Sequence, residues 1–271
     1  MSGRRLDSAL VDRGLARSRT HAARLIADRR VTVGGSVVHK ASSPVDEKTE
    51  VAVQAGDDWA SRGAYKLLGA LRAFRIDVAG RRAIDAGAST GGFTDVLLRH
   101  GAAAVAAVDV GHGQLDPRIA ADPRVHVHDR VNLRELSADQ AAEIADSIGG
   151  KADIVVADLS FISLTLVLPP LARLASDGAD LVPMVKPQFE VGRDRLGAQG
   201  VVRDPALRAA AVQQVADAAR ELGWGVVAAV ASPLPGPSGN VEYFLHLRRG
   251  AMRGSAADRA LIDDAVQRGP Q

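Results

Sequence analysis

From residue 83 onward the chain alternates short apolar segments with longer amphipathic ones, and this alternation constrains the fold more than any other feature. Six apolar segments have the length and composition of strands: 83–86, 104–110, 125–128, 153–158, 181–186 and 226–231. Four helical segments separate strands along this stretch: 93–100, 138–148, 164–174 and 206–222. Such alternation predicts an α/β fold with a parallel sheet and helices on both faces.

The end of the chain departs from this alternation. A last strand, 242–247, follows a loop rich in proline and glycine rather than a helix, so we expect it to run antiparallel to its neighbours. Residues 256–267 predict a terminal helix.

Composition excludes several kinds of site. The chain has no cysteine, which rules out disulfides, iron–sulfur clusters, thiolate zinc sites and cysteine nucleophiles. A metal would need histidine or carboxylate ligands. His126 and His128 share one face of a predicted strand, but no third ligand recurs at a supporting spacing. We therefore interpret the pair as ordinary polar strand positions and expect no metal.

No segment has the sustained run of about 20 apolar residues that a membrane-spanning helix needs. The longest uncharged runs, 159–172 and 223–241, are interrupted by proline or by proline and glycine. The first ten residues lack the apolar core of a secretion signal. We expect a cytoplasmic protein.

Positive charge is concentrated at the N-terminus. Residues 1–30 hold eight arginines and three aspartates, a charge of +5, so the other residues must sum to −3 to give the chain's +2. A basic segment on a slightly acidic body suggests a polyanion-binding module, with nucleic acid as the first partner to consider. A solvated basic face is the alternative that charge alone leaves open.

The same segment resembles a known RNA-binding module. Two short helices, 4–13 and one starting at Ser18, precede a hairpin at 31–38 and a strand at 50–53. This order is similar to the S-four domain of a small-subunit ribosomal protein and some pseudouridine synthases. In that family the second helix and the turn after it hold structured RNA. The resemblance assigns RNA binding to Arg4, Arg17, Arg19, His21, Arg24, Arg29 and Arg30.

A glycine-rich turn joins the first strand of the body to its helix. Three interpretations compete for it. The dinucleotide fingerprint G-x-G-x-x-G is broken, because the glycines are Gly87, Gly91 and Gly92. The hydrolase motif G-x-S-x-G fits around Ser89, but the turn follows the first strand, and the only late candidate base is His246 in the last strand. The third interpretation is an S-adenosylmethionine site, in which an acidic residue at the end of the second strand, Asp109, holds the ribose.

Five motifs in order identify the chain as similar to one family. They are Ser-Arg-Gly-Ala-Tyr-Lys-Leu at 61–67, Asp-Ala-Gly-Ala-Ser-Thr-Gly-Gly-Phe-Thr-Asp at 85–95, Ala-Asp-Leu-Ser-Phe-Ile-Ser-Leu at 157–164, Val-Lys-Pro-Gln-Phe-Glu at 185–190 and Gly-Asn-Val-Glu-Tyr-Phe at 239–244. These resemble the TlyA family, hemolysin-like ribosomal RNA 2′-O-methyltransferases whose catalytic domain is similar to that of the FtsJ/RrmJ methyltransferases.

The resemblance implies an S-four domain at 1–54, a linker at 55–60 and a methyltransferase domain at 61–271. The last is expected to be a Rossmann-like sheet that binds S-adenosylmethionine. Its implied substrates are cytidines of small- and large-subunit ribosomal RNA. The cofactor residues expected from the loop and the strand ends are Asp85, Gly87, Ala88, Ser89, Gly91, Gly92, Phe93, Asp109 and Asp129. Asp129 would contact the adenine, and an ordinary turn carboxylate is the alternative for it.

The family also implies a catalytic tetrad, with matching positions at Lys66, Asp158, Lys186 and Glu242. Three of them flank strands at the edge that carries the glycine turn, whereas Lys66 lies on a predicted helix, 64–74, that must fold back over that edge. The chain has five lysines and 29 arginines, so a lysine at such an edge suggests that a titratable amine is needed.

Methyl transfer to a ribose hydroxyl requires a base. A lysine of ordinary pKa is a poor base at neutral pH, but a neighbouring ammonium and desolvation both lower its pKa. We assign Lys186 as the base, Lys66 as the neighbouring cation that orients the hydroxyl, and the two carboxylates as orienting groups. An ion-pair cluster without catalysis is the alternative.

Other positions carry further expectations. Glu190 and the loop 191–204, with Arg193, Arg195 and Arg203, either reach RNA or form a surface loop. Trp59 either docks the two domains together or covers the edge of one core, and we favour the second.

Two other functions were weighed. A non-catalytic RNA-binding protein would be expected to lack a tetrad residue, and all four are present. A cytolysin would need a spanning or strongly amphipathic segment, and none stands out.

Overall fold

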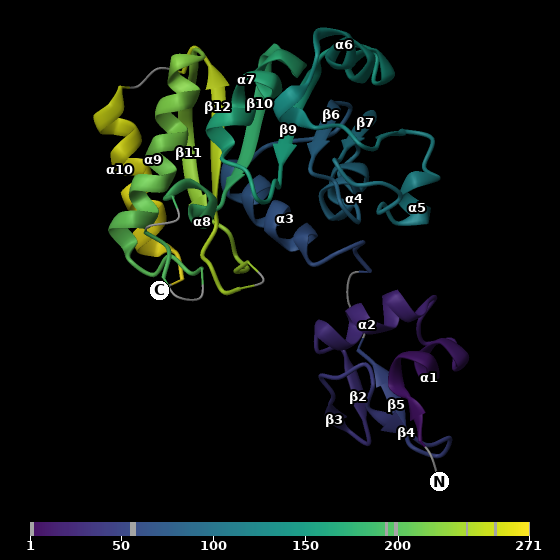
Figure 1. Ribbon diagram of the computed structural model, residues 1–271. Coiled ribbons are helices and arrows are strands. Elements are labelled where there is room, and N and C mark those ends of the chain that lie inside the picture. Colours follow the sequence, from purple (N-terminus) through teal and green to yellow (C-terminus); the bar gives the residue numbers. More distant parts are fainter. Residues whose placement is uncertain are drawn as a thin grey trace. The chain divides into compact units, whose positions relative to one another are not determined.

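The computed structural model describes residues 3–54, 58–192, 195–197, 200–236, 238–251 and 254–270, apart from the side chain of Arg24. The chain divides into two compact units, Met1–Arg62 and Gly63–Gln271, which are described separately here. Figure 1 shows the elements of each unit. The linker predicted at 55–60 lies partly outside the described residues, since 55–57 are not among them.

The first unit is a small α+β module. Helices α1 (Leu6–Asp12) and α2 (Arg19–Ala27) pack together, and strands β2 (Val31–Val33), β3 (Ser36–Val37) and β5 (Val51–Val53) form an antiparallel sheet in the order β3-β2-β5. Its core is a cluster that includes Leu6, Leu10, Leu25, Ile26 and Val31. The apolar residues that predicted two amphipathic helices therefore face one shared core.

The predicted first helix began too early. Arg4 and Arg5 form strand β1 (Arg4–Arg5), which pairs antiparallel with β4 (Pro44–Val45), and the helix begins at Leu6. The backbone N–H of Leu6 donates to the carbonyl of Ser43, 2.8 Å away. Pairing with residues 44–45 thus overrides the local helical pattern. The sequence around Arg4 and Arg5 does not show this pairing, because the partner strand lies about 40 residues further along the chain.

The second unit is built on a seven-stranded sheet in the order β11-β12-β10-β9-β6-β7-β8. The strands are β6 (Arg82–Ala86), β7 (Ala104–Val108), β8 (Val125–His128), β9 (Ala152–Ala157), β10 (Ala175–Val185), β11 (Trp224–Ala231) and β12 (Tyr243–Arg249). Strands β6 to β10 pair in parallel, and β12 runs antiparallel to both β10 and β11. This confirms the predicted α/β fold and the antiparallel last strand.

Helices cover both faces of this sheet (Figure 1). The long helices are α3 (Gly63–Phe74), α4 (Gly92–Arg99), α6 (Ala138–Ser147), α7 (Leu164–Leu174), α9 (Pro205–Glu221) and α10 (Ser255–Arg268). Helix α4 packs on β6 and β7 and against α3, whereas α6, α7, α9 and α10 contribute to one apolar core with the strands. Right-handed crossovers require this division, because the chain reverses direction across the sheet after β8.

Three short elements were not predicted. They are α5 (Pro117–Ala120), the 3₁₀ turn η1 (Leu133–Glu135) and α8 (Pro187–Glu190). Each spans only three or four residues, too few to show a helical period in the sequence. Helix α8 begins directly after Lys186, at Pro187, where the fixed φ of proline favours a first helical position.

A buried charge cluster holds the sheet at the end where β10 begins. Asp180 is fully buried, and its carboxylate contacts three side chains. Its oxygens lie 2.7 Å from Arg81 Nη1, 2.6 Å from His246 Nε2 and 2.5 Å from Arg248 Nε. Burial alone would raise the pKa of Asp180, but the hydrogen bonds from these three groups outweigh it and hold the pKa well below the usual range.

We expect Asp180→Ala to lower the free energy of unfolding by about 3 kcal/mol, because it leaves the buried His246 and the partly buried Arg81 without their carboxylate. Urea denaturation followed by circular dichroism measures this. The control is Asp177→Ala on the same strand, since the Asp177 side chain is 94% exposed and pairs with Arg249 at the surface. Equal losses for the two variants would contradict the expectation.

Candidate active site

The register of the sheet brings the candidate residues to one edge. Ala86 of β6 pairs with Ala157 of β9, so the glycine loop and Asp158 leave the sheet side by side. Val185 of β10 pairs with Tyr243 of β12, so Lys186, which follows Val185, and Glu242, which precedes Tyr243, lie opposite one another. Glu242 therefore reaches the carboxyl edge of the parallel strands because β12 is antiparallel.

The glycine loop passes very close to this edge. Gly87 has φ +87°, and a Cβ atom there would lie 2.6 Å from the carbonyl oxygen of Asp158. Both the conformation and the space exclude a side chain. The N–H groups of Gly87 and Ala88 donate to the carbonyl of Val108 on β7, which fixes the loop over two strand ends.

Asp85 lies beneath the loop and is fully buried. Its Oδ2 accepts a hydrogen bond from Thr94 Oγ1, 2.7 Å away. Burial raises the pKa of Asp85 to about 7, since the bonds from Thr94 compensate only part of the desolvation. Asp85 therefore supports the loop from below and changes its charge near neutral pH.

Two acidic residues at the ends of β7 and β8 fix the next loop. Asp109 accepts from the backbone N–H of Ser89 at 2.8 Å and of Gly111 at 2.7 Å. Asp129 accepts from the N–H of Gly113 at 2.8 Å and lies 2.8 Å from Nδ1 of His112. The bond from Gly113, with the contact to His112, lowers the pKa of Asp129. Asp129 thus holds the loop that follows β7.

A cavity of about 460 Å³, the glycine-loop cavity, opens between these loops and the strand ends. Of the nine predicted cofactor residues, three line it: Gly87, Ser89 and Asp109. Asp158 also lines it, together with apolar residues such as Val110, Val131 and Ile162. Asp85, Ala88, Gly91, Gly92, Phe93 and Asp129 are not among its lining residues, and of these all but Asp129 are buried.

The four tetrad positions form two ion pairs. Lys66 Nζ lies 2.5 Å from Glu242 Oε2, and both side chains are buried. Lys186 Nζ lies 2.6 Å from Asp158 Oδ1 and donates to Ser160 Oγ at 2.8 Å. Each lysine therefore has its own carboxylate.

Close packing positions the buried pair. A Cβ on Gly69 of α3 would lie 2.8 Å from Cγ of Pro233, so the helix that carries Lys66 approaches the loop before β12 closely. A Cβ on Gly236 in the same loop would lie 2.6 Å from Oε1 of Glu242. Glycine at 236 thus leaves space for the carboxylate of Glu242, and glycine at 69 allows α3 to approach Pro233.

A second cavity of about 620 Å³, the lysine cavity, is lined by Lys186 and Glu242. Ser160, Phe161 and Ile162 line this cavity and the glycine-loop cavity alike. The two cavities therefore adjoin at the segment after β9, with Lys186 and Asp158 at the junction. A group bound in one cavity lies next to a group bound in the other, as a transfer reaction requires.

Two residues have roles that the sequence did not indicate. Glu190 is buried and caps α7, accepting from the N–H of Leu164 at 2.8 Å and from Ser163 Oγ at 2.5 Å. Burial raises its pKa. Asn240 lines the lysine cavity and holds the neighbouring loop, since it accepts from Val202 N and donates to the carbonyl of Gly200. Glu190 belongs to the motif at 185–190 and Asn240 to the motif at 239–244, and this membership was the only sign in the sequence that they matter.

The expectation that Glu190 reaches RNA is not favoured by this inward position. In the loop after it, Arg193 lies outside the described residues, Arg195 donates to the carbonyl of Val191, and Arg203 is exposed.

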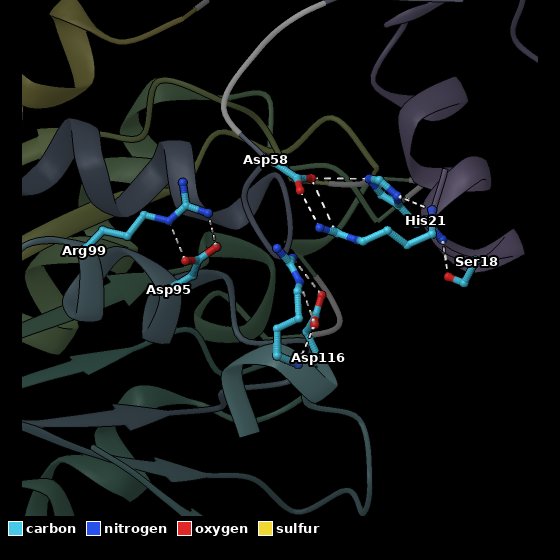
Figure 2. A network of polar contacts seen from close by, with 8 residues as sticks. Ser18, His21, Asp58, Asp95, Arg99 and Asp116 are labelled. Carbon is cyan, nitrogen blue, oxygen red and sulfur yellow. Dashed lines mark hydrogen bonds and ion pairs between the residues drawn. The ribbon is translucent and has the colours of Figure 1, made fainter. Parts of the chain in front are cut away.

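The basic side chains of the first unit are mostly engaged. Arg4 pairs with Asp12, and Arg19 with Asp7. Arg17 lies 2.5 Å from Asp58, which also lies 3.3 Å from Nε2 of His21. Figure 2 shows the contact between His21 and Asp58, together with the Arg99–Asp95 ion pair of α4. Arg30 donates to the carbonyl of Gln54, Arg29 is exposed, and the side chain of Arg24 lies outside the described part.

The alternative chemistries find no support in the geometry. His246 is bound to Asp180, so it is not positioned as the base that Ser89 would need. No group of three potential metal ligands is found among the described residues, and His128 contacts Ser147. Nor does the described part of the chain contain a helix long and apolar enough to cross a membrane.

Comparison with known proteins connects these features. Residues 59–249 match the family of FtsJ-like methyltransferases, and residues 4–51 match the S4 domain. The chain is 54% identical to a 16S/23S rRNA (cytidine-2′-O)-methyltransferase of Mycobacterium tuberculosis, over 97% of this chain and 96% of the relative. It is 33% identical to hemolysin A of Brachyspira hyodysenteriae, over 89% of this chain and 98% of that relative.

A solved structure is also similar. A protein of Streptococcus thermophilus, provisionally named a hemolysin, superposes with a TM-score of 0.74 at 34% identity, over 98% of this chain and 97% of the other.

The pKa of Asp85 leads to a test of the loop support. Because its folded-state pKa of about 7 exceeds the ordinary value near 4, the folded protein holds the extra proton between these values. Its contribution to stability is therefore present below pH 4 and is lost as the pH rises to 7. We expect Asp85→Asn, which cannot ionise, to raise the melting temperature relative to wild type by a few degrees more at pH 8 than at pH 5.

Melting curves at both pH values measure this difference. Asp146→Asn, at an exposed position on α6, is the control. If Asp85→Asn shows the same pH dependence as wild type and the control, Asp85 does not titrate in this range.

Proposed function

Because the chain belongs to the TlyA family of FtsJ-like methyltransferases, we propose that it methylates the ribose 2′-hydroxyl of cytidine in ribosomal RNA, with S-adenosylmethionine as methyl donor. The observation that carries the proposal is the pair of adjoining cavities with Lys186 and Asp158 at their junction. A ribosomal RNA substrate would place the protein in the cytoplasm.

The glycine-loop cavity fits the cofactor. Its volume of about 460 Å³ is in the range of small-molecule sites. Gly87 lines the cavity without a side chain, and each carboxylate oxygen of Asp109 keeps accepting capacity for a ribose hydroxyl beside its bond from an N–H. Val110 and Ile162 offer apolar walls to a flat ring. When bound, S-adenosylmethionine supplies an electrophilic methyl group on a sulfonium.

The lysine cavity is proposed to take the acceptor nucleotide. In its neutral form, Lys186 takes the hydroxyl proton onto Nζ as the ribose oxygen bonds to the methyl carbon and the bond from that carbon to sulfur breaks. Asp158 holds Lys186 in place and stabilises the ammonium that forms. Lys66, fixed by Glu242, orients the hydroxyl as a cationic donor.

The first unit is proposed to hold the RNA. Its arginines lie on exposed surface next to carboxylates, so binding would exchange Asp7, Asp12 or Asp58 for RNA phosphates. Such an exchange is strongly salt-dependent.

Transfer of radiolabelled methyl groups from S-adenosylmethionine to isolated ribosomal subunits tests the activity. Wild type is expected to label a 2′-oxygen, and Lys186→Ala to be slower by about 100-fold or more, because the base is lost. Lys151→Ala, which removes an exposed lysine of the same unit, is the matched control and should retain activity. Absence of label on both subunits and on naked ribosomal RNA, from a protein that binds the cofactor, would refute the RNA assignment.

A second experiment tests the RNA-binding unit. Asp58 pairs with both Arg17 and His21, so Asp58→Asn is expected to tighten ribosomal RNA binding by about 2- to 10-fold at low salt, because two basic groups lose a competing carboxylate. Fluorescence anisotropy at two salt concentrations measures the effect. Asp146→Asn makes the same change in net charge elsewhere, and an equal effect from it would show that only total charge matters.

A further inference from the structure

Ser160 has a contact that the proposed mechanism does not yet use. It lies two residues after Asp158 in the segment that follows β9, and its hydroxyl accepts a hydrogen bond from Lys186 Nζ at 2.8 Å. Ser160 lines both the glycine-loop cavity and the lysine cavity. It therefore stands at the junction where the methyl group would pass.

We propose that Ser160 is a positioning residue that sets the direction of the Lys186 lone pair toward the acceptor hydroxyl. The inference rests on the proposed function, because it concerns the same base. It adds a residue outside the tetrad.

The geometry of an amine gives the reason. A neutral Nζ carries two N–H groups and one lone pair at three tetrahedral positions beside Cε. Ser160 Oγ accepts one N–H at 2.8 Å, whereas Asp158 Oδ1, 2.6 Å from Nζ, is an ion-pair partner without hydrogen-bond geometry. The bond to Ser160 therefore directs one N–H, and the negative charge of Asp158 attracts the second N–H and repels the lone pair, which takes the third position. Without Ser160, the second N–H and the lone pair exchange places freely by rotation about the Cε–Nζ bond.

Asp158 alone does not supply this direction. The attraction between a carboxylate and a lysine depends mainly on distance, and the lysine side chain has a flexible four-carbon stem. Ser160 is a short side chain with a single χ angle, so its oxygen is fixed closely by the backbone. The next residue, Phe161, has φ +64°, an unusual conformation for an aromatic residue. The backbone beside Ser160 thus adopts a strained turn, of the kind that concentrates at functional sites.

The chemical type of the residue also fits. A hydroxyl accepts an N–H without adding negative charge beside Nζ. A second carboxylate in this place would favour the ammonium form and oppose its use as a base. A serine orients the amine and leaves its charge balance to Asp158.

The test compares steady-state kinetics of full-length variants on ribosomal subunits. We expect Ser160→Ala to lower kcat by about 10- to 100-fold with little change in KM for either substrate, because a misdirected base slows the reaction without weakening binding. Ser160→Thr keeps the hydroxyl and should restore most of kcat. Ser160→Cys has similar size but a weak acceptor and should behave like Ser160→Ala. Ser176→Ala, at the start of β10, is the control and should match wild type.

A double-mutant cycle separates positioning from a structural effect. If Ser160 acts through Lys186, then Ser160→Ala causes no further loss in the Lys186→Ala background. A full additional loss there would overturn the inference, as would wild-type kcat in both Ser160→Ala and Ser160→Cys. Melting temperature and cofactor binding are measured for each variant.

These outcomes are distinct from failure of the proposed function. If wild type transfers no methyl group to RNA, the function is wrong and the inference falls with it. If wild type is active and the Ser160 variants are unchanged, the function stands and only the positioning role is refuted.

Discussion

The buried ion pair between Lys66 and Glu242 ties together parts of the second unit that are far apart in the sequence. Its 2.5 Å contact joins α3, which precedes the sheet, to the start of β12, its last strand. Burying two charges is costly unless they are paired at close range, so this contact fixes the position of both elements. A side chain at position 236 would meet the carboxylate of Glu242, and one at position 69 would meet the ring of Pro233 in the loop before β12. The lysine cavity depends on this arrangement, since Glu242 is part of its wall.

The two ends of the sheet use charge differently. At the end where β10 begins, one buried carboxylate, Asp180, is surrounded by two arginines and a histidine. At the opposite end each lysine has one carboxylate, and Lys186 also contacts a neutral hydroxyl. The first arrangement surrounds a buried anion with hydrogen-bond donors, two of them guanidinium groups. The second places Asp158 in the wall of one cavity and Lys186 and Glu242 in the wall of the other.

The sequence predicted the elements well where periodicity extends over many residues. All seven strands and the six long helices that the structure describes in the second unit were anticipated, as was the antiparallel last strand. Errors arose where distant pairing decides. Arg4 and Arg5 continue a helical pattern but form a strand with residues 44–45. Glu190 ends a quoted motif and was expected either to reach RNA or to lie in a surface loop, yet it is buried and caps α7. Short elements such as α8 leave no periodic signal.

By itself, the sequence determined the succession of strands and helices along the chain and the glycine turn, because these depend on local pattern. The four tetrad positions were candidates because their motifs resemble those of a known family. Only the tertiary structure decided which side chains are partners. The structure shows that Asp129 holds a loop and that Lys186 contacts Ser160. It also shows that Arg17 and His21 share Asp58. These contacts follow from distances between segments that are separate in the sequence. A hydrogen bond extends about 3 Å, whereas the sequence specifies only which residues are available to form it.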